Sequence, residues 1–291
     1  MSDTEKLDDS QDHSWFKRPE LFVPQWVVGY ARQTQHLSRW SWDQHERLET
    51  WQSTEGSSFQ ILSINVADEV VRRGAVHSYQ IGISILDTDR LGDALAKTPE
   101  PDVNVAANVI QSHHWVVGDE EYDPKFEDLF RFGKMRYLSK DKLHEQITDI
   151  VEHRNFILIS HGPDKSLSYL KDCGVHFEVL ETIDTEKVVQ DVLQVPADEV
   201  GSKDALIKET GVECQDPVLA GNAAHLTLRI LLMLIQGDVD RHPHRKGVPM
   251  DQWSLLLQRI VNSPSKKRKL RRIKRSPSDS AQQIKNTSIA S

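Results

Sequence analysis

The residues with chemically active side chains are scattered along the chain and form no familiar catalytic pattern. Cys173 and Cys214 lack a local signature that would stabilise a thiolate, and two cysteines are too few for a zinc site. His161 follows one apolar segment and His225 lies inside another, where single histidines are more often structural. No glycine-rich phosphate loop follows a predicted strand, and no Gly-x-Ser-x-Gly motif occurs. We therefore expect no bound metal and no cofactor.

The elements that must position these residues alternate between strands and helices. Strands are predicted for five apolar segments: residues 59–66, 77–86, 109–117, 156–160 and 175–180. Helices are predicted after Ser139 and for residues 164–173, 217–234 and 249–261. Asp216 is the expected N-cap of the long third helix, with Pro217 at its first position. Residues 89–104, which contain two prolines, are expected to form a polar loop.

This order of elements resembles the DEDD-type 3′–5′ exonucleases of the ribonuclease H-like superfamily, and most of all their fungal Gfd-type family. The resemblance covers residues 59–236. Besides the first hairpin, it is carried by FILISHGPDKSLSYL (156–170), ETIDT (181–185) and AGNAAHLTLRILLML (220–234). It implies an α/β domain of the ribonuclease H-like class, with a mixed sheet and helices on both faces.

The resemblance also implies where the catalytic groups should stand, and this chain has replaced all of them. Asn65 and Ala67 stand where the family has Asp-x-Glu on the first strand. Ser166 replaces the third acid, Ala223 the fourth, and Val218 the general-base histidine. Two-metal hydrolysis needs several carboxylates around two divalent ions, and Mg²⁺ requires oxygen ligands. The sequence therefore predicts no catalytic residues, and the chain is interpreted as a pseudo-nuclease.

A groove at the carboxyl ends of the central strands is a further implication of the resemblance. The candidate nucleic-acid contacts there are Asn65, His161, Ser166 and Asn222. Loss of the acids lowers the repulsion between such a groove and phosphate, so binding without cleavage is physically reasonable.

Charge is distributed very unevenly along the chain. Residues 262–291 hold nine Lys or Arg and one Asp, a net charge of +8, so a total of −8 leaves −16 on residues 1–261. An acidic body is atypical of nucleic-acid-binding domains. Eight of the cations form a predicted nuclear localisation signal, which an import receptor would bind: Lys266, Lys267, Arg268, Lys269, Arg271, Arg272, Lys274 and Arg275. Non-specific contact of this tail with RNA or DNA is the alternative.

Two Ser-Pro pairs flank this basic run, at Ser263-Pro264 and Ser276-Pro277. A phosphate on either serine would add a charge of about −1.5 to −2 and offset part of the basic charge. The hypothesis is that phosphorylation of these serines weakens nuclear import.

The domain organisation follows from these boundaries. We predict a disordered acidic lead (1–14), a tryptophan-rich helical arm (15–55), the ribonuclease H-like domain (56–262) and a disordered basic tail (263–291). The arm holds five of the seven tryptophans, which either anchor it to the domain or form a protein-binding surface. No apolar run approaches the ~18 residues of a membrane-spanning helix, so no membrane association is expected.

Three functions remain open from the sequence. The leading interpretation is a nuclear or nucleo-cytoplasmic pseudo-nuclease that binds RNA or single-stranded DNA. The second is a protein-interaction scaffold with no nucleic-acid role, which the −16 body favours. The third is a 3′–5′ exonuclease whose metal ligands are displaced to neighbouring acids.

Overall fold

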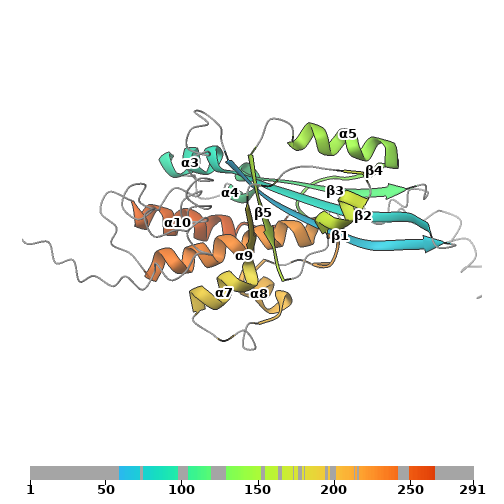
Figure 1. Cartoon of the computed structure of the whole chain (residues 1–291). Coiled ribbons are helices and arrows are strands. Elements are labelled where there is room, and N and C mark those ends of the chain that lie inside the picture. Colours follow the sequence, from blue (N-terminus) through green and yellow to red (C-terminus); the bar gives the residue numbers. More distant parts are fainter. Residues whose placement is uncertain are drawn as a thin grey trace, which may run out of the picture.

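A computed structural model gives the fold of the central part of the chain (Figure 1). It describes residues 59–72, 75–97, 104–118, 129–151, 155–162, 166–172, 174–175, 179, 181–193, 196, 201–212, 214, 216–241 and 249–265. The predictions for the acidic lead, the tryptophan-rich arm and the basic run from residue 266 onward lie outside the described residues.

A mixed sheet of six strands forms the centre of the molecule, in the order β4-β3-β2-β1-β5-β6. The strands are β1 (Phe59–Arg72), β2 (Ala75–Asp87), β3 (Ile110–Gly118), β4 (Met135–Leu138), β5 (Asn155–Ser160) and β6 (Glu181–Asp184). Strands β1, β2 and β3 form an antiparallel meander, whereas β3–β4, β1–β5 and β5–β6 are parallel pairs. The predicted fold class, a ribonuclease H-like mixed sheet, is confirmed.

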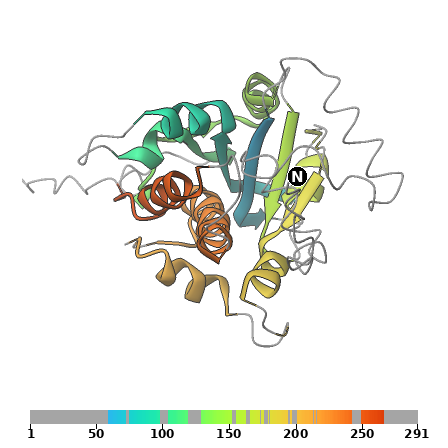
Figure 2. The same ribbon diagram turned by 90° about the vertical axis from the view of Figure 1, so that its left-hand side faces the viewer.

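Helices pack on both faces of this sheet and divide the core into two layers. One layer contains α3 (Thr88–Ala96), α4 (Val105–Val109), α7 (Thr185–Leu193), α8 (Lys203–Glu209), α9 (Ala220–Arg241) and α10 (Met250–Val261). The other contains α5 (Lys140–Val151) and α6 (Ser166–Asp172). Figure 2 shows α9 and α10 side by side on their face of the sheet. Within the described residues, no helix has the length and apolarity needed to cross a membrane.

Alternation along β1 explains how one strand serves both layers. Successive side chains of a strand point to opposite faces, so Ile61 packs in the α9 layer while Leu62 and Ile64 pack in the α5 layer. All three are almost completely buried. The near-continuous apolar run that predicted a buried strand therefore reflects a strand covered on both sides.

The start of α9 lies unusually close to the middle of β2. A Cβ atom built on Gly82 would lie 1.9 Å from the carbonyl oxygen of Ala220 and 2.5 Å from the backbone nitrogen of Gly221. Because glycine has no Cβ, the helix backbone can rest directly on the strand. Gly82 thereby fixes where α9 begins relative to β1 and β2.

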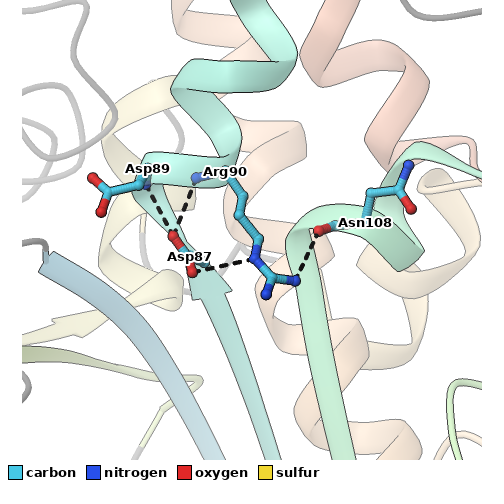
Figure 3. A network of polar contacts seen from close by, with 4 residues as sticks. All are labelled: Asp87, Asp89, Arg90 and Asn108. Carbon is cyan, nitrogen blue, oxygen red and sulfur yellow. Dashed lines mark hydrogen bonds and ion pairs between the residues drawn. The ribbon is translucent and has the colours of Figure 1, made fainter.

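Residues 88–96 form helix α3, so the prediction of a polar loop over residues 89–104 is wrong for its first half. The Asp87 carboxylate caps this helix by accepting hydrogen bonds from the backbone N–H groups of Asp89 and Arg90. Arg90 also pairs with Asp87 and approaches the Asn108 carbonyl (Figure 3). Leu91 anchors the helix in the core, and one buried leucine within a polar segment is a weak periodic signal.

Helix α9 begins at Ala220, not at Pro217, and Asp216 is not its N-cap. Residues 217 and 218 form a turn, and the N–H of Ala223 donates to the Leu219 carbonyl at 2.8 Å. The Asp216 carbonyl instead accepts a hydrogen bond from the Asn222 side chain. Tertiary contacts, rather than the local capping pattern, determine the start of this helix.

The last strand also differs from the sequence prediction. The strand lies at Glu181–Asp184, where Ile183 pairs with Ile159 of β5. Val175 and Val179 are not in a strand, and the other residues of the predicted strand at 175–180 lie outside the described part of the chain. Helix α6 ends at Asp172, Gly174 follows it with a φ of 78°, and the N–H of the buried Val175 donates back to the Leu170 carbonyl of that helix. Val175 therefore packs against α6 and is not paired with a strand of the sheet.

We predict that Gly82→Ala strongly destabilises the domain, because the added methyl group would overlap the backbone of α9. The expected loss is about 3 kcal/mol or more in the free energy of unfolding, measured by urea denaturation. Gly92→Ala is the matched control, since nothing lies within 4 Å of that Cβ position in α3. The control should be neutral or gain up to about 1 kcal/mol of stability. Equal midpoints for Gly82→Ala and the parent chain would disprove the close contact.

Candidate functional site

The first two degenerate positions lie on β1, in the part of the strand that extends past its last pair with β5. That pairing ends at Ser63, so Asn65 and Ala67 lie beyond it. Asn65 is paired with Gly82 on β2, and Gly82 with His114 on β3. Paired residues on neighbouring strands point to the same face, so this row lies under the start of α9.

Ser166 lies directly against the same part of β1. Its hydroxyl group accepts a hydrogen bond from the backbone N–H of Val66 at 3.2 Å, and its side chain is 5% exposed. Val66 stands between Asn65 and Ala67. The structure therefore brings together three positions that are up to 101 residues apart in the chain.

The two positions on the long helix are placed differently from each other. Ala223 lies in the first turn of α9 and is 5% exposed. Val218 precedes the helix and is 72% exposed. Because the start of α9 rests on Gly82, which pairs with Asn65, the first turn of the helix lies over the row that contains Asn65.

The groups present do not fit two divalent metal ions, which DEDD-type exonucleases use. Asn65 supplies a neutral amide, Ala67 and Ala223 supply methyl groups, and the Ser166 hydroxyl already accepts the Val66 N–H. Mg²⁺ is normally held by carboxylates and water in near-octahedral geometry. Within the described residues, no group of three or more His, Cys, Asp or Glu side chains could hold a metal ion.

Of the acids at this end of the sheet, Asp184 has a structural role, whereas the side chains of Asp68 and Glu69, directly after Ala67, lie outside the described residues. The Asp184 carboxylate accepts the backbone N–H groups of Gly162 and Glu186 at 2.9 and 3.0 Å. Asp216 receives Asn222 on its backbone carbonyl, and Asp164 lies outside the described residues. None of these observations places a carboxylate beside Asn65.

Asn222 is a structural residue, and a direct contact between it and a nucleic acid is not supported. Its side chain is completely buried. Its amide oxygen accepts the N–H of Arg131, and its amide nitrogen donates to the carbonyls of Leu129 and Asp216. These three bonds join the start of α9 to the segments around residues 129–131 and 216, and they use the side chain fully.

His161 lies at the carboxyl end of β5, at the edge of the same site. Its Nδ1 atom is 2.8 Å from the Thr185 hydroxyl, which donates its proton to the Ser160 carbonyl. Nδ1 must therefore carry the imidazole proton, and Nε2 is an acceptor. Burial, and then the positive charge of Lys203, lower the pKa of His161, while Glu186 and Asp184 oppose this shift. His161 is thus neutral at pH 7.

Two buried histidines, one on β3 and one on α9, form contacts between the sheet and this helix that the sequence did not reveal. His114 is 0% exposed, and its Nδ1 accepts the backbone N–H of Gly221 at 3.0 Å. Burial lowers its pKa to about 4. His225 is stacked on Phe132, with ring centroids 3.7 Å apart. Burial, and secondarily the charge of Arg229, hold the pKa of His225 well below its usual value.

Comparison with protein families identifies the superfamily. Residues 69–234, more than half of the chain, match the DEDDh_C family model, described as DNA polymerase III subunit epsilon-like, C-terminal domain. The chain belongs to this family. It is therefore a member of the DEDD exonuclease superfamily with a ribonuclease H-like fold. A search of curated proteins found no match.

The DEDDh_C match contains three of the five degenerate positions. Ser166, Val218 and Ala223 fall within it, whereas Asn65 and Ala67 precede its first residue. The β1–β2 register, the hydrogen bond of Ser166 and the contact of α9 with Gly82 nevertheless bring Asn65, Ala67, Ser166 and the first turn of α9, which contains Ala223, to one region of the fold. The order of the motifs along the chain was enough to predict which positions belong together. The roles of His114 and Asn222 depend on tertiary contacts, which the sequence does not show.

We predict that His114 makes the fold sensitive to acid. The pKa of His114 is about 4 in the folded chain, against about 6.5 when unfolded. As the pH falls from 6.5 toward 4, His114 binds a proton in the unfolded state but not in the folded state. The free energy of unfolding therefore decreases. The decrease in the free energy of unfolding that His114 contributes by pH 4 is roughly 3 kcal/mol. Asn at position 114 can retain an acceptor for Gly221 and does not titrate.

The test is urea unfolding of His114→Asn at several pH values between 7 and 4.5. We expect its free energy of unfolding to fall by roughly 2 kcal/mol less than that of the parent over this range. His144→Asn, at an exposed position on α5, is the control and should follow the parent. A parent-like pH slope in His114→Asn would contradict the assignment.

Proposed function

We propose that this chain is a catalytically inactive, nucleic-acid-binding member of the DEDD superfamily that acts in the nucleus. We further infer that it is a degenerate member of the fungal Gfd-type branch, which its first hairpin and the segments at 156–170, 181–185 and 220–234 resemble. The replacement of all four acids and the general base carries the proposal. A site that had lost one ligand could retain weak metal binding, but amide, hydroxyl and methyl groups cannot replace four carboxylates.

The neutral groups around β1 suit a particular kind of contact. Asn65 offers an amide, and His161 offers an unprotonated Nε2 acceptor at the end of β5. Such groups hydrogen-bond to base edges and ribose hydroxyls, and they provide no charge for phosphates. Without carboxylates, the site also lacks the strongest source of repulsion toward a nucleic-acid backbone.

The basic tail can supply the missing positive charge. The main-chain segment that precedes it is fixed at Ser263, whose carbonyl accepts a hydrogen bond from Arg229 of α9. Arg229 is nine residues along α9 from Ala220, or about 14 Å at 1.5 Å per residue. Ten extended residues span up to about 35 Å. Residues 266–275 are therefore long enough to reach a strand bound beside Asn65 and neutralise its phosphates.

A protein-interaction scaffold is the second candidate, and one observation favours it. Residues 1–261 carry a net charge of −16, which repels nucleic acid at long range. In that case, the five tryptophans of residues 15–51 would provide the partner surface and the tail would bind an import receptor. A 3′–5′ exonuclease with displaced ligands is the least supported alternative, because the Asp184 carboxylate is engaged in structural contacts and Asn65, Ala67, Ser166 and Ala223 supply no carboxylate.

We predict that the full chain binds 20-nucleotide single-stranded RNA or DNA equally well with and without Mg²⁺. Fluorescence anisotropy would measure the affinity over a range of salt concentrations. A variant with the eight cations of 266–275 replaced by Gln should bind at least tenfold more weakly and with a smaller salt slope. Further replacement of Asn65 by Leu should weaken the residual binding. Absence of binding by the parent chain would favour the scaffold.

Reintroducing the family's groups should restore metal binding if the five positions are assigned correctly. The variant combines Asn65→Asp, Ala67→Glu, Ser166→Asp, Ala223→Asp and Val218→His. Calorimetric titration should give a Mn²⁺ affinity at least tenfold higher than that of the parent, because four carboxylates then converge. The matched control carries Ala223→Asn in place of Ala223→Asp. A folded variant with parent-like Mn²⁺ affinity would show that the positions are assigned wrongly.

A further inference from the structure

The residues just before the basic run are part of the folded domain. Ser263 is 5% exposed, although it was predicted to begin a disordered tail. Its hydroxyl group donates to the Arg259 carbonyl at 2.7 Å and accepts the N–H of Ala106 at 3.1 Å. The next carbonyl, that of Pro264, accepts a hydrogen bond from the Asn104 side chain at 3.0 Å. These contacts attach the end of α10 to the start of α4.

Arg229 completes this attachment from the side of α9. Its guanidinium group is buried, with 1% of the residue exposed, and donates to the carbonyls of Val261 and Ser263. Its Nε donates to His225 at 2.9 Å, so the protonated Nδ1 of His225 faces the Ser112 hydroxyl at 2.8 Å. The pKa of Arg229 is lowered to about 10 by burial, and the group remains charged at pH 7.

Ser263 is also the first residue of a Ser-Pro pair, which is the target sequence of proline-directed kinases. We propose that Ser263 is a gated phosphorylation site, modified only when residues 261–265 have left the domain and unable to return once phosphorylated. In the reaction, the Ser263 Oγ attacks the γ-phosphorus of ATP and the bond to ADP breaks. The hydroxyl proton passes to the base of the kinase, and ADP leaves.

Phosphate and the attached conformation exclude each other for three reasons. The phosphorylated Oγ has no proton to donate to the Arg259 carbonyl. A charge of about −1.5 to −2 would be buried where the serine is 5% exposed. The buried cation at this attachment, Arg229, is already bonded to backbone carbonyls of the same segment and to His225, so pairing with the phosphate would break those bonds.

Release of this segment changes the reach of the basic run. The five residues 261–265 add about 17 Å of extended chain to its tether. The attachment at Arg229 therefore restrains where the cations of residues 266–275 can act, and phosphorylation of Ser263 removes the restraint. This differs from a simple reduction of the tail charge, which phosphorylation of Ser276 would produce equally.

Hydrogen exchange of the full chain tests the attachment. Ser263→Glu should reduce the protection of the Ala106 amide and the last turn of α10 at least tenfold. Ser276→Glu carries the same charge in the same tail and should leave both unchanged. Protection of β1 and β5 amides serves to show that Ser263→Glu remains folded. Parent-like protection at Ala106 in Ser263→Glu would overturn the proposal.

Phosphorylation rates test the gating without a variant of Ser263. With a proline-directed kinase, we expect Ser276 of the native chain to be modified at least tenfold faster than Ser263. A peptide of residues 258–270 should accept phosphate at Ser263 as fast as the native chain does at Ser276. Arg229→Met should increase the rate at Ser263 in the full chain. Equal rates at both serines of the native chain, or an unreactive peptide, would refute gating.

Discussion

The contact between the backbone of α9 and Gly82 is the constraint on which the rest of the structure depends. Without a Cβ on β2 at this point, Ala220 and Gly221 rest on the strand itself. His114 accepts the Gly221 N–H on one side of Gly82, and Asn65 lies on the other side of the same row. The contact therefore sets both the depth of the helix in the core and the position of its first turn over the degenerate site.

Polar side chains then fix the helix along its length. Asn222 binds the segments before it, His225 bonds to Ser112, and Arg229 bonds to the end of α10. Ser112 in turn bonds to Ser84, which carries the network into β2. Because burial keeps His114 and His225 neutral, these side chains supply hydrogen bonds without adding buried positive charge. The sequence run AGNAAHLTLRILLML (220–234) is buried at every position except Met233, including Ala223, which replaces the fourth acid of the family.

The sequence was sufficient for the parts of the fold that depend on strong local patterns. The alternation and apolarity of residues 59–66 and 77–86 identified β1 and β2, and residues 156–160 identified β5. It failed where tertiary contacts override local signals. Asp216 and Pro217 form a good capping pattern, but Asn222 holds that segment as a turn. The basic run that follows Ser263 places it in the predicted tail, and nothing local indicates the buried Arg229 that binds its carbonyl.

For the candidate site, too, the sequence predicts the positions but not the tertiary contacts that they make. The degenerate positions could be named from sequence order, and the structure adds that Ser166 reaches Val66 between Asn65 and Ala67. It also removes Asn222 from the candidate contacts, because its amide is fully bonded inside the domain. What remains is a cluster of neutral groups in an acidic body, and the segment that leads into the basic tail is attached about 14 Å away along α9.

The most direct test of the central claim is a single-turnover cleavage measurement. The full chain, in excess over 3′-end-labelled single-stranded RNA or DNA, would be incubated with Mg²⁺ or Mn²⁺ and the labelled products separated by size. The account predicts that no labelled mononucleotide is released over hours. Release that requires the metal and stops on chelation would contradict it and would show that displaced acids form a working two-metal site.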